Sequence, residues 1–125
     1  KLEGKVILGD FSAQTSSLLA GASVLVVPSQ AYESFGLTII EAMAFGVPVV
    51  TTDVGGMPEV LGDSKAGYVC SKDNPLEFAA AIKNILGDPK LASELGQNGR
   101  LAFERRFMAS AMAQQYFQLI KKDPK

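Results

Sequence analysis

Short apolar runs limit the folds that this chain can adopt. Val6-Ile7-Leu8, Val24 to Val27 and Val47 to Thr52 are brief, rich in β-branched residues and not alternating with polar ones. Gly67 to Cys70 is a weaker fourth candidate. Such runs are typical of strands that are covered on both faces, as in a parallel sheet. We therefore expect about four parallel strands.

Helical stretches lie between these runs. They extend from about Ala13 to Gly21, from Leu37 to Phe45, and from Pro58 to Leu61. Because strands and helices alternate, the sequence predicts an α/β fold with a doubly wound parallel sheet. In open sheets of this kind, ligands bind beyond the carboxyl ends of the strands.

The second half of the chain is predicted to be helical. Asn74 offers an N-cap, Pro75 suits the first helical position, and Glu77 is an acid in the first turn. Gly87 marks the end of this helix. The apolar residues between these signals form one stripe: Phe78, Ile82, Ile85 and Leu86.

Further helical stretches follow. Asp88-Pro89 repeats the start signal for a helix that runs to Gly96, and another stretch leads from Gly99 to Phe107. A terminal helix is indicated by apolar residues at helical spacing: Met112, Tyr116, Leu119 and Ile120.

Length and charge exclude several classes of function. The chain has 125 residues, enough for one domain, and no apolar run approaches the roughly 18 residues that a membrane helix needs. The net charge is −1 with acids and bases interspersed, so we expect no nucleic-acid partner. The densest basic group, Arg100 to Arg106, includes Glu104 and is interpreted as a solvated helix face.

The chain contains one cysteine and no histidine. It therefore lacks the ligands of an ordinary zinc site and the partners for Ser-His or Cys-His catalysis, so a general base within it must be a carboxylate. Cys70 is expected to be a buried strand thiol, and a single cysteine fits a reducing compartment. We expect a cytoplasmic location. Because the chain opens on Lys1 to Gly4 without an initiator Met or a signal peptide, we expect a fragment of a longer protein.

Two predicted strand ends carry candidate binding residues. Residues 29–36 follow the second apolar run and residues 53–59 follow the third. Gly36 stands at the entrance of the helix from Leu37, where backbone N–H groups and the helix dipole favour an anion such as a diphosphate. The alternative is that Gly36 only makes the turn.

Glu33 and Glu41 flank this entrance. Glu41 lies on a helix that is apolar nearly all round, so either it has a partner or it forms a thin solvated stripe with Thr38. If the intervening residues were all helical, the two glutamates would lie about 12 Å apart along the axis, too far for a shared proton. If Glu33 lies in a loop, the pair could bracket a long ligand, and a carboxylate suits a vicinal diol.

Five ordered segments carry a family resemblance. They are Pro28-Ser29, Glu33 to Leu37, Glu41 to Ala44, Gly46 to Val50 and Gly55 to Glu59. Together they resemble the glycosyl transferases group 1 family, retaining enzymes with two Rossmann-like domains (the GT-B architecture) and a nucleotide-sugar donor. The resemblance implies that residues 1–125 are most of a C-terminal donor-binding domain, with a Rossmann-like sheet followed by C-terminal helices.

The resemblance also implies roles for matching residues. Glu33 matches the glutamate that contacts the donor sugar near the reacting carbon, and is the predicted catalytic residue. Glu41 matches the glutamate that accepts hydrogen bonds from the ribose hydroxyls. The loop whose backbone amides face the sugar and the diphosphate matches Ser34, Phe35, Gly36 and Leu37.

Two more regions of the binding cleft are implied by the same resemblance. Gly55 and Gly56 match a second backbone wall of the cleft. The region where the base is held, mostly by backbone, matches Leu8, Gly9, Asp10 and Phe11.

Other parts of such an enzyme are expected to precede Lys1. These are a basic pair that neutralises the diphosphate, the first strands of this sheet, and the acceptor domain. The resemblance therefore implies a hexosyl-type transferase that needs no cofactor or metal, and a fragment that is inactive alone. It does not specify the acceptor, and it is compatible with membrane association of the full enzyme. Met108-Ala109 departs from the family pattern before the last helix.

The residues described above discriminate among three functions. The first is the transferase; the second is a degenerate domain kept as a binding module, which the loss of Glu33 or Gly36 would have favoured. The third is a receiver-like scaffold, for which Asp10 and Asp53 are too few and too separated.

The fragment is also expected to self-associate. Without its partners it should expose the edge of the Val6-Ile7-Leu8 strand or the apolar face of Met112, Tyr116 and Ile120.

Overall fold

A parallel sheet of three strands forms the centre of the fold. The structure is a computed structural model that describes residues 3–122. Strands β1 (Leu25–Val27), β2 (Val49–Thr52) and β3 (Gly67–Cys70) lie in the order β1-β2-β3, with β2 in the middle. All four residues of β2 are buried, which agrees with the non-alternating pattern of its sequence.

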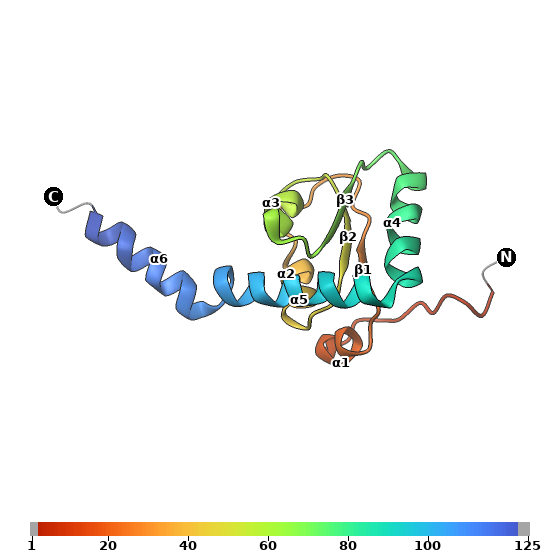
Figure 1. The fold of residues 1–125 in the computed structure, drawn as a ribbon, viewed down its shortest axis with the longest axis horizontal. Coiled ribbons are helices and arrows are strands. Elements are labelled where there is room, and N and C mark those ends of the chain that lie inside the picture. Colours follow the sequence, from red (N-terminus) through yellow and green to blue (C-terminus); the bar gives the residue numbers. More distant parts are fainter. Residues whose placement is uncertain (1–2, 123–125) are drawn as a thin grey trace.

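Helices cover both faces of this sheet, as Figure 1 shows. On one face α2 (Leu37–Ala44) and α3 (Met57–Leu61) bury Ile39, Met43 and Met57 in a core with Val49. On the other face α4 (Pro75–Gly87) packs against Val50 and Cys70 of the sheet. The fold is therefore α/β with a Rossmann-like arrangement, as predicted.

The predicted strand at Val6-Ile7-Leu8 is wrong. These residues lie in an extended segment without strand pairing in the described part of the chain, and Ile7 and Leu8 are each 94% exposed. A strand is stable only when its backbone groups find a partner, and the three strands of the sheet pair only with one another. The segment leads instead to a short helix, α1 (Thr15–Ala20).

The predicted start of α4 is confirmed in detail. The side chain of Asn74 accepts a hydrogen bond from the backbone N–H of Glu77 at 3.1 Å. At the next start signal, the Asp88 carboxylate accepts from the N–H groups of Lys90 and Leu91, both at 3.0 Å. These bonds satisfy amides that have no partner within the helix.

The two helices predicted after Asp88 are one helix in the structure. Helix α5 (Pro89–Arg106) runs without a break through Gly96 and Gly99, which are buried against α2 and its surroundings. A Cβ atom added to Gly96 would lie 2.1 Å from the carbonyl oxygen of Gly46. Gly96 therefore permits close helix packing and does not end a helix.

Side chains of α5 fasten it to the rest of the domain. Arg100 forms an ion pair with Glu104 at 2.7 Å and donates a hydrogen bond to the carbonyl of Ala44, at the end of α2. Arg106 donates to the carbonyls of Glu59 and Val60, at 3.0 and 3.1 Å. The basic group is therefore exposed, as predicted, but its arginines also bind the last carbonyls of two helices.

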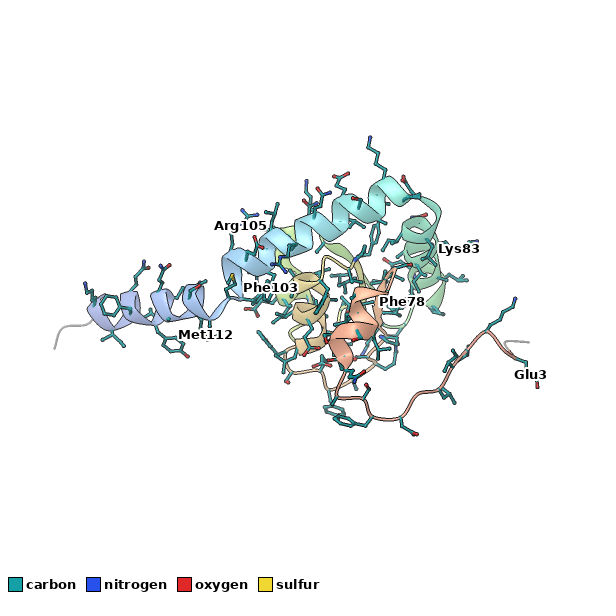
Figure 2. The ribbon with its side chains drawn as sticks, turned by 90° about the horizontal axis from the view of Figure 1, so that it is seen from below. Glu3, Phe78, Lys83, Phe103, Arg105 and Met112 are labelled. Carbon is teal, nitrogen blue, oxygen red and sulfur yellow. The ribbon has the colours of Figure 1, made fainter. Side chains whose placement is uncertain are left out.

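The last helix, α6 (Ala109–Lys122), projects away from the body of the domain (Figure 1). It starts directly after Phe107 and Met108, so the unusual Met108-Ala109 pair does not prevent its formation. Figure 2 shows Met112 beyond the packed part of the molecule, whereas Phe103 lies where α5 meets the body. Among residues 3–122, no helix has the length and apolar character needed to cross a membrane.

Candidate functional site

Two loops meet at the carboxyl edge of the sheet. The Glu33 loop, residues 28–36, joins β1 to α2, and the glycine loop, residues 53–56, joins β2 to α3. A Cβ atom added to Gly55 would lie 1.6 Å from the carbonyl oxygen of Glu33, and one added to Gly56 would lie 2.6 Å from that of Ser34. The backbones of the two loops are therefore in direct contact, and the structure brings together the two strand ends singled out in the sequence.

Glu33 lies in the loop and not on the helix. Its side chain is half-buried, and Oε1 accepts a hydrogen bond from the backbone N–H of Gly36 at 3.0 Å. The carboxylate thus occupies the N-terminal end of α2, where the helix dipole favours negative charge. Because Glu33 is not helical, the separation of about 12 Å expected for a continuous helix from Glu33 to Glu41 does not apply.

Gly36 is the N-cap of α2 and has a left-handed backbone, with φ 84° and ψ 54°. It is buried, and an added Cβ would lie 3.1 Å from Ile39 Cδ1 and 3.3 Å from Met57 Cγ. Gly36 has no side chain to cap the helix, and the Ile39 amide donates back to the Gly36 carbonyl at 3.0 Å, which leaves the amides of Leu37 and Thr38 to donate to an anion. Ser34, Phe35 and Leu37 around it are exposed.

Glu41 is exposed on the same helix. It lies one turn after Thr38, which is also exposed, while Ile39, Ala42 and Met43 are buried on the opposite side. The structure therefore shows the solvated stripe that the sequence left as one of two alternatives. A carboxylate on such a stripe is free to accept hydrogen bonds from a ligand that lies along the helix.

The site thus combines a helix whose N-cap is glycine, a glutamate in the preceding loop and a second glutamate on the helix. This arrangement can be compared with known families. The family model of the glycosyl transferases group 1 matches residues 1–102. The chain belongs to this family. The match contains the Glu33 loop, the glycine loop and Glu41, and it also contains the segment at residues 8–11.

Curated group 1 relatives extend well beyond this chain. The chain is 32% identical over 115 residues to the N-acetyl-alpha-D-glucosaminyl L-malate synthase of Bacillus anthracis, covering 92% of this chain and 30% of that protein. It is 38% identical over 84 residues to the D-inositol 3-phosphate glycosyltransferase of Streptomyces avermitilis, covering 67% of this chain and 18% of that protein. The chain therefore spans less than a third of the length of these relatives.

Solved structures share the fold. The Anabaena HepE protein in complex with UDP-glucose superimposes with a TM-score of 0.85 at 27% identity, over 98% of this chain and 34% of that one. The sucrose-phosphate synthase of Thermosynechococcus elongatus gives 0.77 at 37% identity, over 92% and 29%. The C-terminal domain of a group 1 family protein from Francisella tularensis gives 0.67 at 26% identity, over 83% and 53%.

The segment predicted to hold the base, residues 8–11, is exposed to solvent. Leu8 is 94% exposed and Phe11 is 97% exposed, and nothing lies within 4 Å of a Cβ added at Gly9. Asp10 is exposed as well. Its role in binding stays a prediction.

Two buried threonines that were not among the predicted site residues support the site. Thr51 and Thr52 end the central strand and are at most 1% exposed. The Thr52 hydroxyl donates to the carbonyl of Ser29, in the Glu33 loop, at 2.5 Å. The Thr51 hydroxyl donates to Met57 Sδ at 2.9 Å. Hydroxyl side chains at the end of an otherwise apolar strand were the signal in the sequence.

The other polar groups at this edge are held by backbone contacts. The Asp53 carboxylate accepts a hydrogen bond from the N–H of Lys72 at 2.9 Å, which ties the glycine loop to the loop after β3.

Burial raises the pKa of the Cys70 thiol, and the charge of Glu77 raises it further. Cys70 is therefore a buried strand thiol, as predicted, and not an activated nucleophile.

Two cavities lie near this edge, and the second touches the Glu33 loop at Pro28 and Gln30. One of about 380 Å³ is bounded by Gly62, Asp63 and the end of α5. Another of about 200 Å³ lies between the strand ends and α4, and includes Thr52, Lys72 and Phe78 in its lining. Neither cavity is lined by Glu33, Gly36 or Glu41.

Proposed function

We propose that this chain is the C-terminal donor-binding domain of a retaining glycosyltransferase. The whole enzyme transfers a hexosyl-type sugar from a nucleoside-diphosphate sugar to an acceptor. The observation that carries the proposal is the Glu33 loop, packed on the glycine loop at a helix N-terminus whose N-cap, Gly36, has no side chain. The domain assignment is supported by the superposition on a group 1 structure described as a C-terminal domain.

In the proposed complex, the diphosphate lies at the N-terminal end of α2. When the bond between the anomeric carbon and the diphosphate oxygen breaks, negative charge grows on the leaving diphosphate. The open amides and the dipole of α2 stabilise this charge. The acceptor hydroxyl oxygen then bonds to the anomeric carbon on the same face of the sugar, and its proton passes to an oxygen of the leaving diphosphate.

The two glutamates divide the work of holding the donor. Glu33 lies beside the sugar, where its carboxylate accepts hydrogen bonds from hydroxyl groups near the reacting carbon. To do so it exchanges its present partner, the N–H of Gly36, which becomes available to the sugar or the diphosphate. Glu41, exposed on α2, accepts from the ribose hydroxyls. The complexes of HepE with UDP-glucose and with UDP support a donor of this class.

The proposal also covers the location of the enzyme, its cofactor need and its base-binding region. The enzyme acts in the cytoplasm, needs no metal or cofactor, and holds the base near residues 8–11. The chain alone does not carry out transfer, because the acceptor contacts and a basic pair for the diphosphate come from another part of the enzyme.

The test uses the whole protein that carries this chain. It is incubated with UDP-glucose, UDP-N-acetylglucosamine, ADP-glucose and GDP-mannose, and release of nucleoside diphosphate is measured. The proposal expects release from one of these donors. From an α-linked donor, the transfer product should be α-linked, or, if the donor is hydrolysed, the sugar should be released in the α configuration. An inverted product would overturn the retaining mechanism, and no release from any donor would overturn the proposed function.

A further inference from the structure

The Glu33 loop is attached to the central strand at its beginning. The hydroxyl of Thr52, at the end of β2, donates to the carbonyl of Ser29 at 2.5 Å, across 23 residues of sequence. Thr52 is 1% exposed and Ser29 is half-buried, so the Thr52 hydroxyl cannot turn to bulk water instead. Loss of the hydroxyl would leave the Ser29 carbonyl without this donor.

Thr52 is itself held in a fixed position. It pairs with Cys70 in the register of β2 and β3. The next residue, Asp53, donates its N–H to the Cys70 carbonyl at 2.9 Å and accepts from the Lys72 N–H at 2.9 Å. The backbone that carries the Thr52 hydroxyl is therefore held by the neighbouring strand and by the loop after it.

The same strand end holds the loop at a second point. The glycine loop follows Thr52 directly, and Gly55, with φ +58°, packs against the carbonyl of Glu33 so closely that no Cβ would fit. Only the residues between Ser29 and Glu33 separate the two contacts. One of them, Tyr32, has a φ of 57°, an uncommon value for a residue with a side chain. The conformation of this short loop is thus set by its two contacts with the end of β2.

We propose that Thr52 is a positioning residue, whose hydroxyl fixes the Glu33 loop and so the place of the Glu33 carboxylate at the N-terminus of α2. Its effect on transfer rests on the proposed function, whereas its effect on the loop does not. Thr52 does not touch the donor in this account. It acts through Ser29 and the path of the loop, and the hydrogen bond between Glu33 and Gly36 reports where the loop places the carboxylate before the donor binds.

The first test needs no ligand. The exchange rate of the Gly36 amide hydrogen is measured by NMR in the chain of 125 residues and in its Thr52→Val variant. Valine keeps the shape of threonine and removes the hydroxyl, so the Gly36 amide should lose its steady bond to Glu33 and exchange about tenfold faster or more. Thr52→Ser keeps a hydroxyl and should restore most of the protection; Thr52→Ala replaces Thr52→Val if that variant does not fold.

Thr51→Val is the matched control. Thr51 is equally buried and adjacent, but its hydroxyl lies 2.9 Å from Met57 Sδ and 3.4 Å from the carbonyl of Val27, and it does not contact the loop at Ser29. It should lower general stability without a specific rise in Gly36 exchange. Unchanged Gly36 exchange in Thr52→Val, or an equal rise in Thr51→Val, would overturn the proposal.

The second test separates this inference from the proposed function. In the whole enzyme with UDP-glucose as the probe, Thr52→Val should lower kcat by roughly 10- to 100-fold with a smaller change in KM, because a displaced catalytic group slows the chemical step. Rescue by Thr52→Ser would support a positioning role. If the unmodified enzyme does not turn over UDP-glucose, that result counts against this donor, while the Gly36 exchange still decides the role of Thr52. A wild-type kcat in Thr52→Val would overturn its role in transfer.

Discussion

Gly55 and Glu33 show how single residues set the geometry of this site. Gly55 has a positive φ and lies against the Glu33 carbonyl with no room for a side chain, so glycine is required by both backbone conformation and contact. Glu33 in turn places its carboxylate on the N–H of Gly36. The predicted wall formed by Gly55 and Gly56 is therefore also the surface on which the Glu33 loop is built.

The two glutamates should fail differently when changed in the whole enzyme. Glu33→Gln should lower kcat, because Glu33 lies beside the reacting sugar in the proposed complex. Glu41→Gln should mainly raise the donor KM, because ribose is held similarly in the ground and transition states. Loss of a charge-assisted hydrogen bond is worth about 1.5–3 kcal/mol, or roughly 10- to 150-fold in each quantity.

Steady-state kinetics with a donor that the enzyme accepts measures both quantities. Thr38→Val is a suitable control, since Thr38 shares the exposed stripe of Glu41 but carries no charge. Identical kinetic profiles for the two glutamate variants would reject the division of roles.

At the scale of elements, the packing of α5 on α2 explains where the sequence was informative and where it was not. Local signals such as the Asn74 cap and the buried run of β2 predicted α4 and the sheet, because these depend on neighbouring residues. Gly96 was read as the end of a helix, but its meaning depends on Gly46, fifty residues away. Val6-Ile7-Leu8 has the composition of a strand, yet no local pattern shows whether a partner strand is present.

The candidate site could be predicted to a similar extent. Glu33, Gly36 and Gly55 were found because they stand at strand ends, and parallel strand ends share one edge of a sheet. The bond between Thr52 and Ser29 could not be predicted, since it depends on the register of two strands and on the path of a loop.

Gly96→Ala provides a test of the helix packing. Alanine favours a helix by about 1 kcal/mol, but the added Cβ would overlap the Gly46 carbonyl, so the variant should lose roughly 1–3 kcal/mol of stability. Gly87→Ala, in the last turn of α4, meets no atom within 4 Å and should keep or slightly increase stability. Urea denaturation of both variants measures the difference. A Gly96→Ala variant as stable as Gly87→Ala would show that the two helices do not approach so closely.

At the scale of the whole molecule, the chain has a packed body and two extended ends. The segment before α1 and the helix α6 both leave the body, and each carries exposed apolar side chains (Figures 1 and 2). The chain also spans less than a third of the group 1 relatives described above. In the proposed function, activity, acceptor and donor are therefore properties of the whole protein, in which this domain forms one side of the site.

Self-association of the chain is expected through α6. The strand edge considered at Val6-Ile7-Leu8 does not exist, but Met112, Tyr116 and Ile120 lie on one side of α6 and are 52–72% exposed. An apolar helix face of this kind favours association in water. Analytical ultracentrifugation at micromolar concentration should show dimers or larger species.

A charge on this face should abolish the association. Tyr116→Lys should give a monomer, whereas Gln114→Lys, on the opposite side of the helix, should not. A monomeric unmodified chain, or equal effects of the two variants, would contradict the role of α6.

Transfer activity is not expected of the chain by itself. The described residues near α2 offer amides and a helix dipole to the diphosphate, and two further charge-assisted contacts would each contribute about 1.5–3 kcal/mol. Without them, donor affinity should be weak. Incubation of the chain with the same four sugar nucleotides should release no nucleoside diphosphate; measured turnover would contradict this expectation.

The central claim is that the donor lies on the Glu33 loop and the N-terminus of α2. Hydrogen exchange of the whole enzyme, followed by mass spectrometry with and without the donor that it turns over, tests this claim most directly. The donor should slow exchange in peptides that cover residues 33–41 and 53–57, because their amides bind it or are shielded by it. Peptides at the cavity beside Gly62 and Arg106 serve as the internal control and should not change. Protection confined to that cavity, or elsewhere with residues 33–41 unchanged, would contradict the account.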